Sequence, residues 1–258
     1  MTLKEEQEYN MIKDGISFKE STGRWLAHYP WVKDPSTLPN NKCIALATMK
    51  STERRLMRDP DQASLYTQQI DDMLHRGAAR IVSESELEEH EKGKFYLSHH
   101  AVMKVDSKTT PCRIVFNSSA KYEGKSLNDY LAKGPSLLNS IFGILLRFRL
   151  KRYAFVGDIK KMFHCIDIPL RDQLTHLFLW RNFDTGRPPD TYAMTKVNMG
   201  DKPSSCIAQC ALQRTAEEAS TEYPEASKIV LRNSYMDDIP ASVDSQTERN
   251  RIMREIPC

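Results

Sequence analysis

The sequence predicts an α+β protein in which an antiparallel sheet is covered on one side by helices. Three observations support this fold class. Strand-like apolar runs alternate with segments whose apolar residues recur at helical spacing over 258 residues. Several strand-like runs occur as neighbours joined by short polar links, which favours antiparallel pairing. A hydrophobic share of 40% and a charged share of 28%, with no biased tract, are typical of a globular protein with a sizeable core.

The elements follow from these patterns in chain order. The turn-rich stretch "YPWVKDPSTLPNN" is expected to be extended chain or loop, and "SESELEEHEKGK" is expected to be a short exposed helix or loop. Helices are expected at 61–76, 139–150, 203–223 and 245–256. Strands are expected at 94–105, 111–119, 153–156, 175–183, 190–200 and 226–235.

Local signals sharpen three of these elements. Gly77 is a plausible stop for the helix at 61–76, and Ser245 with Glu248 forms a capping-box pattern at the start of the last helix. The segment "NSIFGILLRFRL" is expected to be a buried helix capped by Asn139. The run "YAFV" is expected to be a buried strand that leads directly into Asp158.

Net charge and the absence of membrane or secretion signals in the sequence narrow the class of protein. The formal net charge of +3 does not by itself indicate nucleic-acid binding. The sequence contains no run of 18 apolar residues, so no membrane span is predicted. The charged N-terminus lacks the apolar core of a secretory signal. The chain is therefore expected to be intracellular, in the cytoplasm or nucleus, and not secreted.

The six cysteines are scattered, so a reducing compartment would leave them as thiols. The neighbours His164 and Cys165, and the pair His99 and His100, could suggest zinc. No second ligand pair with short spacing accompanies them, so ordinary helix packing is the favoured interpretation.

Basic residues surround one acid in the middle of the chain. From Arg147 to Lys161 there are six basic residues and a single acid, Asp158. A solvated helix end followed by a turn would explain this pattern. A site that handles phosphates near a metal ion would also need it.

Three carboxylates follow strand-like runs. Asp158 ends one run, and Asp237 and Asp238 follow another in "NSYMDDIP". Two neighbouring strands could bring these acids to one edge, where like charges repel. Divalent cations between them would make the arrangement tolerable, and two such ions can catalyse in-line phosphoryl transfer.

A strand-borne aspartate followed by a "YMDD" hairpin is similar to the site of reverse transcriptase palms. Further blocks resemble the Pol polyprotein of Bel/Pao-type LTR retrotransposons in the same order. They are "FYLSHHAVMK", "RIVFNSSAKYEGKSLNDYLAKGPSLLNSIFGILLRFR", "FVGDIKKMFHCI", "FLWR" and "ALQRTAEE". The resemblance covers roughly residues 25–245, and several ordered blocks are more specific than one motif.

The resemblance implies a reverse transcriptase, an RNA-directed DNA polymerase that adds deoxynucleotides to a primer 3′-OH with two Mg²⁺ or Mn²⁺ ions. It implies an N-terminal segment at 1–60, fingers at 61–150 and a palm at 151–258. The expected partners are an RNA or DNA template with its primer and deoxynucleoside triphosphates, with no membrane. The oligomeric state stays open.

The resemblance also assigns the acids. Asp158 matches the first metal-binding aspartate of the family, and Asp237 and Asp238 match the hairpin pair. On this assignment Asp237 binds metal together with Asp158, while Asp238 is more peripheral and faces the primer end.

Residues after the first aspartate match the family's nucleotide-binding segment. The backbone at Lys160, Lys161 and Met162 is expected to cradle the triphosphate. Phe163 matches the steric gate, whose ring would exclude a ribose 2′-hydroxyl. A core phenylalanine is the alternative for Phe163.

Two further segments match substrate-binding positions of the family. Lys104 and Arg113 lie on the strands flanking "DSKTT", where the family supplies cations to the triphosphate, and Arg113 can hold phosphate bidentately. A solvated strand residue is the alternative for either. Gly200 corresponds to the turn that lets the backbone approach a base or sugar, and a plain turn glycine is the alternative.

The chain departs from the family pattern in places. Asn117 stands where the family usually has aspartate, and "MGDKPSS" differs from the usual "Phe-Gly-x-x-x-Ser-Pro" turn. Only 20 residues follow Asp238, so the palm is expected to be incomplete and the chain truncated before the thumb.

Two alternatives to an active polymerase stay open. The chain could be an inactive, truncated or domesticated retroelement remnant that at most binds nucleic acid. It could also be an unrelated α+β protein in which "YMDD" is an exposed polar hairpin.

Overall fold

The computed structural model describes residues 1–90, 93–104 and 111–256, and the chain within it forms two compact units. Unit 1 comprises Met1–Ile16, Gly134–Met162 and Ser205–Cys258, and unit 2 comprises Ser17–Lys133 and Phe163–Ser204. The units interleave along the chain, so neither coincides with the contiguous ranges 1–60, 61–150 and 151–258 expected from the sequence. The division into fingers and palm stays a prediction.

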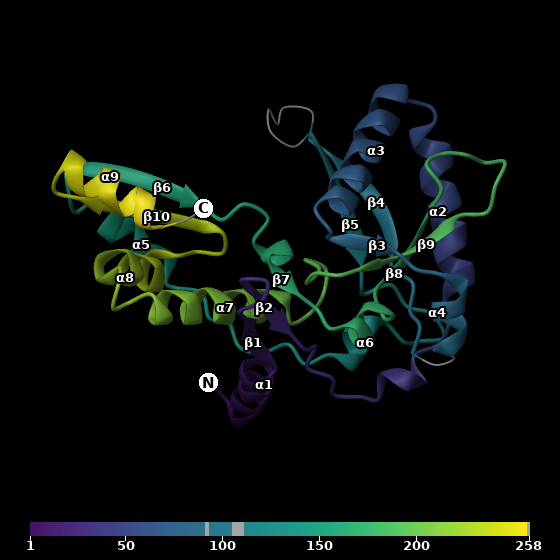
Figure 1. Cartoon of the computed structure of the whole chain (residues 1–258), viewed down its shortest axis with the longest axis horizontal. Helices are drawn as coiled ribbons and strands as arrows, with labels where there is room; N and C mark the ends of the chain where they lie inside the picture. Colours follow the sequence, from purple (N-terminus) through teal and green to yellow (C-terminus); the bar gives the residue numbers. More distant parts are fainter. Residues whose placement is uncertain (91–92, 105–110, 257–258) are drawn as a thin grey trace. The chain divides into compact units, whose positions relative to one another are not determined.

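Unit 1 pairs two strands and packs helices against them (Figure 1). Its elements are α1 (Leu3–Asp14), α5 (Ile141–Phe148), β6 (Tyr153–Asp158), α7 (Ser204–Glu218), α8 (Pro224–Asn233), β10 (Asp238–Val243) and α9 (Gln246–Glu255). Strands β6 and β10 are antiparallel, from the pair Asp158–Asp238 at one end to Tyr153–Val243 at the other.

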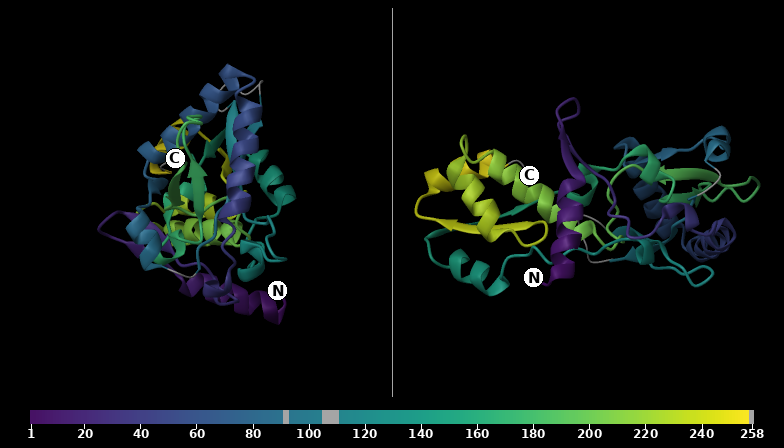
Figure 2. Two further views of the ribbon diagram at one scale, coloured as in Figure 1. Left: turned by 90° about the vertical axis from the view of Figure 1, so that its right-hand side faces the viewer. Right: turned by 90° about the horizontal axis from the view of Figure 1, so that it is seen from below.

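One face of the β6–β10 pair forms the core of unit 1. Phe155 of β6 and Ile239, Ala241 and Val243 of β10 alternate with exposed or half-exposed neighbours, as strands with one buried face require. Side chains of α7, α8 and α9, together with Ile256 just after α9, cover this face: Ala216, Ala226, Val230 and Ile252. The views of Figure 2 show these helices along the strand pair. The sequence prediction of an antiparallel sheet covered by helices is confirmed here.

Within its described residues, unit 2 contains three small sheets. Its strands are β1 (Ile16–Lys19), β2 (Arg24–Ala27), β3 (Ala79–Ile81), β4 (Ser98–Met103), β5 (Cys112–Asn117), β7 (Ile166–Asp167), β8 (Leu177–Trp180) and β9 (Asp190–Met194). The sheet orders are β1-β2-β7, β3-β9-β8 and β4-β5. The β4–β5, β3–β9 and β8–β9 pairs are antiparallel, whereas β2 and β7 are parallel.

Helices flank these sheets. The helical elements of unit 2 are η1 (Pro35–Thr37), α2 (Lys42–Leu56), α3 (Pro60–His75), α4 (Glu84–Glu89), η2 (Leu127–Tyr130) and α6 (Leu170–Gln173), and η3 (Met162–Cys165) begins at the boundary between the units. Glu53 of α2 and Arg181, just after β8, form a buried ion pair with a 2.7 Å contact between carboxylate and guanidinium. This pair ties α2 to the end of the β8–β9 sheet, and both partners have their hydrogen bonds satisfied, as buried charges require.

Several sequence predictions are confirmed. The helix expected at 61–76 is α3, the exposed acidic helix is α4, and the last helix begins at the Ser245 cap, whose hydroxyl accepts from the Glu248 amide. The strand pairs expected at 94–119 and 175–200 are β4–β5 and β8–β9. The polar link expected at 106–110 lies outside the described residues.

The strand expected at 226–235 is wrong, because this segment is α8. Proline at the first helical position, Pro224, favours a helix start, and Ala226, Val230 and Asn233 bury one helical face. The helix expected over 203–223 also ends earlier, at Glu218.

The buried helix expected at 139–150 is wrong in its burial. Helix α5 begins at Ile141 and is capped by Ser140, not Asn139. Within it Ile144 is fully buried, but Phe142 is 70% exposed and most other apolar side chains are exposed as well. The strand at 153–156 is likewise only partly buried, with Phe155 facing the core and Val156 exposed.

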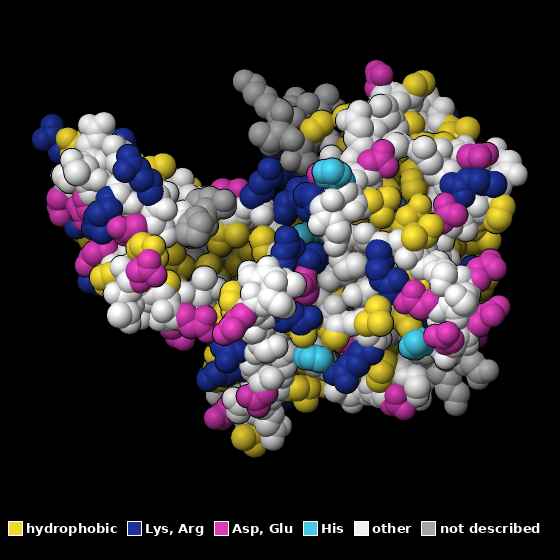
Figure 3. Space-filling view, in the orientation of Figure 1, with side chains coloured by type: hydrophobic (Ala, Val, Ile, Leu, Met, Phe, Trp, Pro, Cys, Tyr) yellow, Lys and Arg dark blue, Asp and Glu magenta, His cyan; other side chains and the backbone are white. Residues whose placement is uncertain are grey.

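Among the residues that the structure describes, no helix is both long enough and apolar enough to cross a membrane. In the face shown in Figure 3, acidic and basic side chains are interspersed over unit 2.

Candidate functional site

Strand register brings two of the predicted acids together at one end of unit 1. Asp158 is the last residue of β6 and Asp238 is the first residue of β10, and the two are direct partners across the pair. Side chains of directly opposed residues project from the same face of a sheet. Asp158 and Asp238 therefore share the face opposite to the core, and both are exposed.

The third acid lies in the turn that leads into β10. The backbone of Tyr235 and Asp238 is paired by two hydrogen bonds, which leaves Met236 and Asp237 as a two-residue turn. The Asp237 carbonyl accepts from the Ile159 amide at 2.8 Å, so this turn is joined to the end of β6. The prediction that the three acids lie at one edge is consistent with this geometry.

The turn holds a strained residue. Met236 has φ of 55°, a region that favours glycine, and such conformations persist only when surrounding contacts impose them. Two side chains of α7 supply those contacts: Ser205 Oγ lies 3.6 Å from Met236 Sδ, and Gln209 Nε2 donates to the Met236 carbonyl. Helix α7 therefore sets the conformation of the acidic turn.

Like charges at this edge change the acidity of Asp238. Partial burial raises the pKa of Asp238, and the negative charges of Asp237 and Asp158 raise it further. This repulsion is what a divalent cation would relieve, and oxygen-only donors suit Mg²⁺ or Mn²⁺. In residues 1–90, 93–104 and 111–256, however, no three His, Cys, Asp or Glu side chains are grouped so that they could hold a metal ion. The donor chemistry fits such an ion, and the side chains would have to converge to bind it.

The register bears on the roles expected for the hairpin acids. The resemblance makes Asp237 the partner of Asp158 and Asp238 the peripheral acid. In the structure the residue directly opposite Asp158 is Asp238. Asp237 is next to this pair through its backbone, so the two roles are left for experiment to separate.

The segment after Asp158 is a tight turn followed by a short helix. Lys160 and Lys161 are exposed, and Lys161 has φ of 55°, a second strained non-glycine residue beside the acids. Met162 is buried and its amide donates to the Ile159 carbonyl. Phe163, in unit 2, is half-buried. Its ring is thus neither fully exposed nor part of the buried core.

The predicted triphosphate cations lie on the outer face of the β4–β5 pair. Arg113 of β5 is exposed and is opposite the exposed Val102 of β4. Lys104 follows β4, is exposed, and its amide donates to the Pro111 carbonyl. Because Val102 and Lys104 are two residues apart, Lys104 continues the face that carries Arg113.

Gly200 lies where its backbone touches the end of β5. A Cβ atom added to Gly200 would lie 2.4 Å from the Phe116 carbonyl oxygen, so no other residue fits without a backbone shift. Gly200 is exposed, on the loop that joins β9 to α7. A close approach of two backbones, and not a plain turn, therefore requires glycine here.

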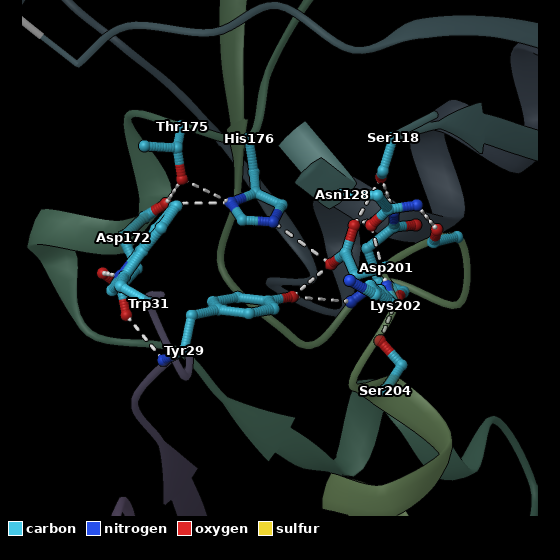
Figure 4. A network of polar contacts seen from close by, with 12 residues as sticks. Tyr29, Trp31, Ser118, Asn128, Asp172, Thr175, His176, Asp201, Lys202 and Ser204 are labelled. Carbon is cyan, nitrogen blue, oxygen red and sulfur yellow. Dashed lines mark hydrogen bonds and ion pairs between the residues drawn. The ribbon is translucent and has the colours of Figure 1, made fainter. Parts of the chain in front are cut away.

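A network of buried polar groups supports this loop from inside unit 2 (Figure 4). Its centre is Asp201, which is fully buried and accepts hydrogen bonds from four side chains on separate segments. The donors are Ser118 Oγ, Asn198 Nδ2, Tyr29 Oη and His176 Nε2.

The hydrogen bonds of His176 indicate an imidazolium ion. Its Nε2 lies 3.1 Å from the Asp201 carboxylate, and its Nδ1 lies 2.9 Å from the Asp172 carbonyl oxygen. Nδ1 also lies 2.9 Å from Thr175 Oγ1, whose hydroxyl donates to the same Asp172 carbonyl. Acceptors at both ring nitrogens therefore favour a proton on each. Burial alone would lower the pKa of His176, but the Asp201 charge and these hydrogen bonds outweigh burial and raise it.

Asp201 is correspondingly ionised. Burial alone would raise the pKa of Asp201, but the His176 cation and the donors Ser118 and Tyr29 lower it. A fully buried Asp201–His176 contact, in which both pKa shifts favour the charged forms, therefore lies directly beside Gly200.

The histidines considered for zinc do not form a metal site in the described part of the chain. His99 is buried between Tyr66 Oη and the Leu179 carbonyl, and burial lowers its pKa to about 4 although that carbonyl opposes the shift. His99 is therefore a satisfied core histidine of strand β4, and the helix packing favoured from the sequence is wrong for it.

The fold is similar to that of a solved viral polymerase. The crystal structure of a prototype foamy virus protease–reverse transcriptase, in its CSH mutant form, matches with a TM-score of 0.51 and 16% sequence identity. The match covers 76% of this chain and 22% of the viral chain, so the present chain spans less than a quarter of that protein. No protein-family model and no curated protein sequence matches this chain. The likeness shows a reverse-transcriptase-like fold, and it does not distinguish the Bel/Pao group from other relatives.

Sequence reasoning missed the supports of the Gly200 loop. The sequence assigned no role to Asp201, His176 or Asn128, although Asn128 lies in one of the blocks that resemble the family. Several of their partners are distant in the chain, such as Tyr29 and Ser118 for Asp201. The one available signal was the aspartate next to Gly200 in "MGDKPSS", at a turn that departs from the family pattern.

Removing one charge from the acidic edge should stabilise unit 1. Asp238→Asn is expected to raise the free energy of unfolding by about 0.2–1 kcal/mol, because like charges directly opposed across strands destabilise a sheet and solvent screens the effect. Urea denaturation at neutral pH measures this difference. Asp71→Asn, the same change on the exposed surface of α3, serves as control, and an equal gain in both variants would contradict the repulsion.

The Asp201–His176 pair should make stability depend on pH. The raised pKa of His176 gives a contribution that is complete below about pH 6.5 and is lost as pH rises through the folded-state pKa. The lowered pKa of Asp201 gives a contribution that is complete above about pH 4 and is lost as pH falls through its folded-state pKa. We expect wild-type urea midpoints to fall between pH 6 and pH 9 more steeply than those of His176→Gln. Parallel curves would show that the pair does not titrate.

Proposed function

We propose that this chain is the reverse transcriptase domain of a Bel/Pao-type retrotransposon polyprotein, which adds deoxynucleotides to a primer 3′-OH. The observation that carries the proposal is the pairing of Asp158 with Asp238 across β6 and β10, with Asp237 in the adjoining turn. The reverse-transcriptase-like fold supports it. The expected substrates are deoxynucleoside triphosphates and an RNA or DNA template with its primer.

The three acids are the groups proposed to hold two Mg²⁺ or Mn²⁺ ions. When bound, such ions activate the attacking hydroxyl and stabilise the leaving oxygen of an in-line displacement. The role of the chain is to hold three carboxylates at one exposed edge in spite of their repulsion, with α7 fixing the turn. Their charge then gives the edge its affinity for cations.

Substrate contacts are proposed for the turn after Asp158 in unit 1 and, separately, for residues of unit 2. The backbone at Lys160 and Lys161 would approach the triphosphate, and a strained Lys161 is the kind of conformation found at binding sites. Arg113 would contribute a bidentate contact to phosphate oxygens, and Lys104 would contribute a point charge. Phe163 would exclude a ribose 2′-hydroxyl, and Gly200 would let the backbone meet the nucleotide.

An inactive remnant that only binds nucleic acid is the second candidate. It is favoured by the fact that the described residues contain no group of side chains already arranged around a metal position. Primer extension separates the two candidates: template binding without extension, in Mg²⁺ and in Mn²⁺, would support the remnant.

Loss of either of two acids should abolish synthesis. Asp158→Asn and Asp237→Asn are each expected to reduce primer extension at least about 100-fold, as removal of electrostatic stabilisation from a transition state does. Retained activity in either variant would overturn the metal assignment. Asp238→Asn, compared under the same conditions, tests the roles: a loss as large as that of Asp158→Asn would favour the strand partner over the peripheral role.

A smaller side chain at the proposed gate should relax sugar selection. Phe163→Val is expected to raise the ratio of ribonucleotide to deoxynucleotide incorporation about tenfold or more, since a steric exclusion is removed. Single-nucleotide extension with paired dNTP and rNTP titrations measures this ratio. Phe148→Val, at another half-buried phenylalanine, is the matched control, and an unchanged ratio in Phe163→Val would make Phe163 a packing residue.

A further inference from the structure

We propose that Asn128 and Asp201 are positioning residues that clamp the Gly200 loop against the end of β5, and that this clamp sets the affinity for the incoming nucleotide. The inference rests on the proposed function, because that function places the nucleotide at Gly200. It adds two residues that neither the family resemblance nor the sequence motifs assign.

The first step is the contact between the loop and β5. The Gly200 backbone packs so closely on the Phe116 carbonyl that a Cβ would lie 2.4 Å from the oxygen. Phe116 and Arg113 belong to the same strand, three residues apart. The loop and the strand that carries the proposed phosphate ligand are therefore in direct backbone contact.

The second step is the outer half of the clamp. Asn128, in η2, bonds to the loop at two positions: its Oδ1 accepts from the Lys202 amide at 2.8 Å, and its Nδ2 donates to the Gly200 carbonyl at 3.1 Å. The same amide group donates to Ser119 Oγ at 2.8 Å, just after β5. One side chain thus joins the loop on both sides of Asp201, at Gly200 and at Lys202, to the residue just after β5. Figure 4 shows Asn128 beside Asp201 and Lys202.

The third step is the inner half. Asp201 follows Gly200 directly, and its Oδ1 accepts from Ser118, again just after β5, and from Asn198 at the start of the loop. Its Oδ2 accepts from Tyr29 and His176, which belong to the body of unit 2. A buried carboxylate with four donors has no other low-energy position, because any displacement would leave a charge unpaired in the interior.

The two halves together restrict the loop, one through its backbone at Gly200 and Lys202 and the other through the Asp201 side chain. Neither residue is placed where it would touch substrate: Asp201 is fully buried, and the polar atoms of Asn128 bond to the protein. Loss of the clamp should therefore weaken nucleotide binding without removing a group that takes part in the chemistry. This separates both residues from the acids and from Arg113.

The test uses the whole chain and two kinds of measurement. Asn128→Ala removes all three side-chain bonds, and Asn128→Asp keeps the acceptor for Lys202 but loses both donors. We expect Asn128→Ala to raise KM for the dNTP on the order of tenfold with kcat within about twofold, and Asn128→Asp to raise KM as well. Asn250→Ala, on the exposed side of α9, is the control and should change neither constant.

Hydrogen–deuterium exchange provides a readout that does not depend on activity. Amides of residues 198–202 and 204 should exchange faster in Asn128→Ala and in Asp201→Asn than in wild type, while amides of α9 keep their rates. Urea denaturation shows whether Asp201→Asn still folds, and Asn128→Ala tests the clamp if it does not. Unchanged exchange in Asn128→Ala would overturn the clamp.

The outcomes distinguish this inference from the proposed function. Wild-type activity with an unchanged KM in folded Asn128→Ala would overturn the link to nucleotide affinity and leave the polymerase assignment standing. Failure of the wild type to extend a primer in Mg²⁺ and Mn²⁺ would overturn the proposed function, and equilibrium dialysis with a dNTP then decides the inference. Equal dNTP binding by wild type and Asn128→Ala, or none by either, would overturn it.

Discussion

The repulsion among three carboxylates at the end of the β6–β10 pair is the constraint on which unit 1 depends. Register places Asp158 opposite Asp238, and the neighbouring turn adds Asp237. Each like-charge contact of this kind destabilises a sheet by roughly 0.2–1 kcal/mol. The opposite face of the same strands buries Phe155, Ile239 and other apolar side chains, at roughly 1.5–3 kcal/mol for each large one. Packing on one face therefore offsets repulsion on the other.

A second unfavourable feature is compensated in the same way in unit 2. The buried carboxylate of Asp201 would be costly alone, but His176 and three neutral donors satisfy it. At both places a costly group lies next to a strained or tightly packed backbone position, Met236 in one case and Gly200 in the other. Such groups persist only where the surrounding structure holds them, which is why they mark candidate sites.

Elements with one strong local signal could be predicted from the sequence, and elements with two competing signals could not. The Ser245 cap and the apolar spacing of α3 each admitted one interpretation. The segment of α8 contains β-branched residues that favour a strand, but it also begins with Pro224 and buries every third or fourth residue, and tertiary packing decided for the helix. For α5 the apolar residues were visible in the sequence, and their spacing predicts a helix with an apolar face. The spacing does not predict whether another part of the chain packs on that face, and most of these side chains are exposed.

The site divides in the same way. The sequence shows that Asp158 ends one strand-like run and that the "YMDD" acids adjoin another. If the two strands are antiparallel neighbours, these ends lie at the same edge of the sheet, so the proximity of the acids could be predicted. The strand ends were not enough to say which acid is opposite Asp158, since a shift of one residue in register would exchange Asp237 and Asp238. The support of Gly200 was beyond sequence reasoning for a different reason. Its bonds join Tyr29, the segment from Ser118 to Asn128, and His176. These three parts are far apart in the chain and become neighbours only when unit 2 is folded. Chemistry carried by adjacent residues can thus be read from the sequence, while the groups that hold it in place are found only in the folded chain.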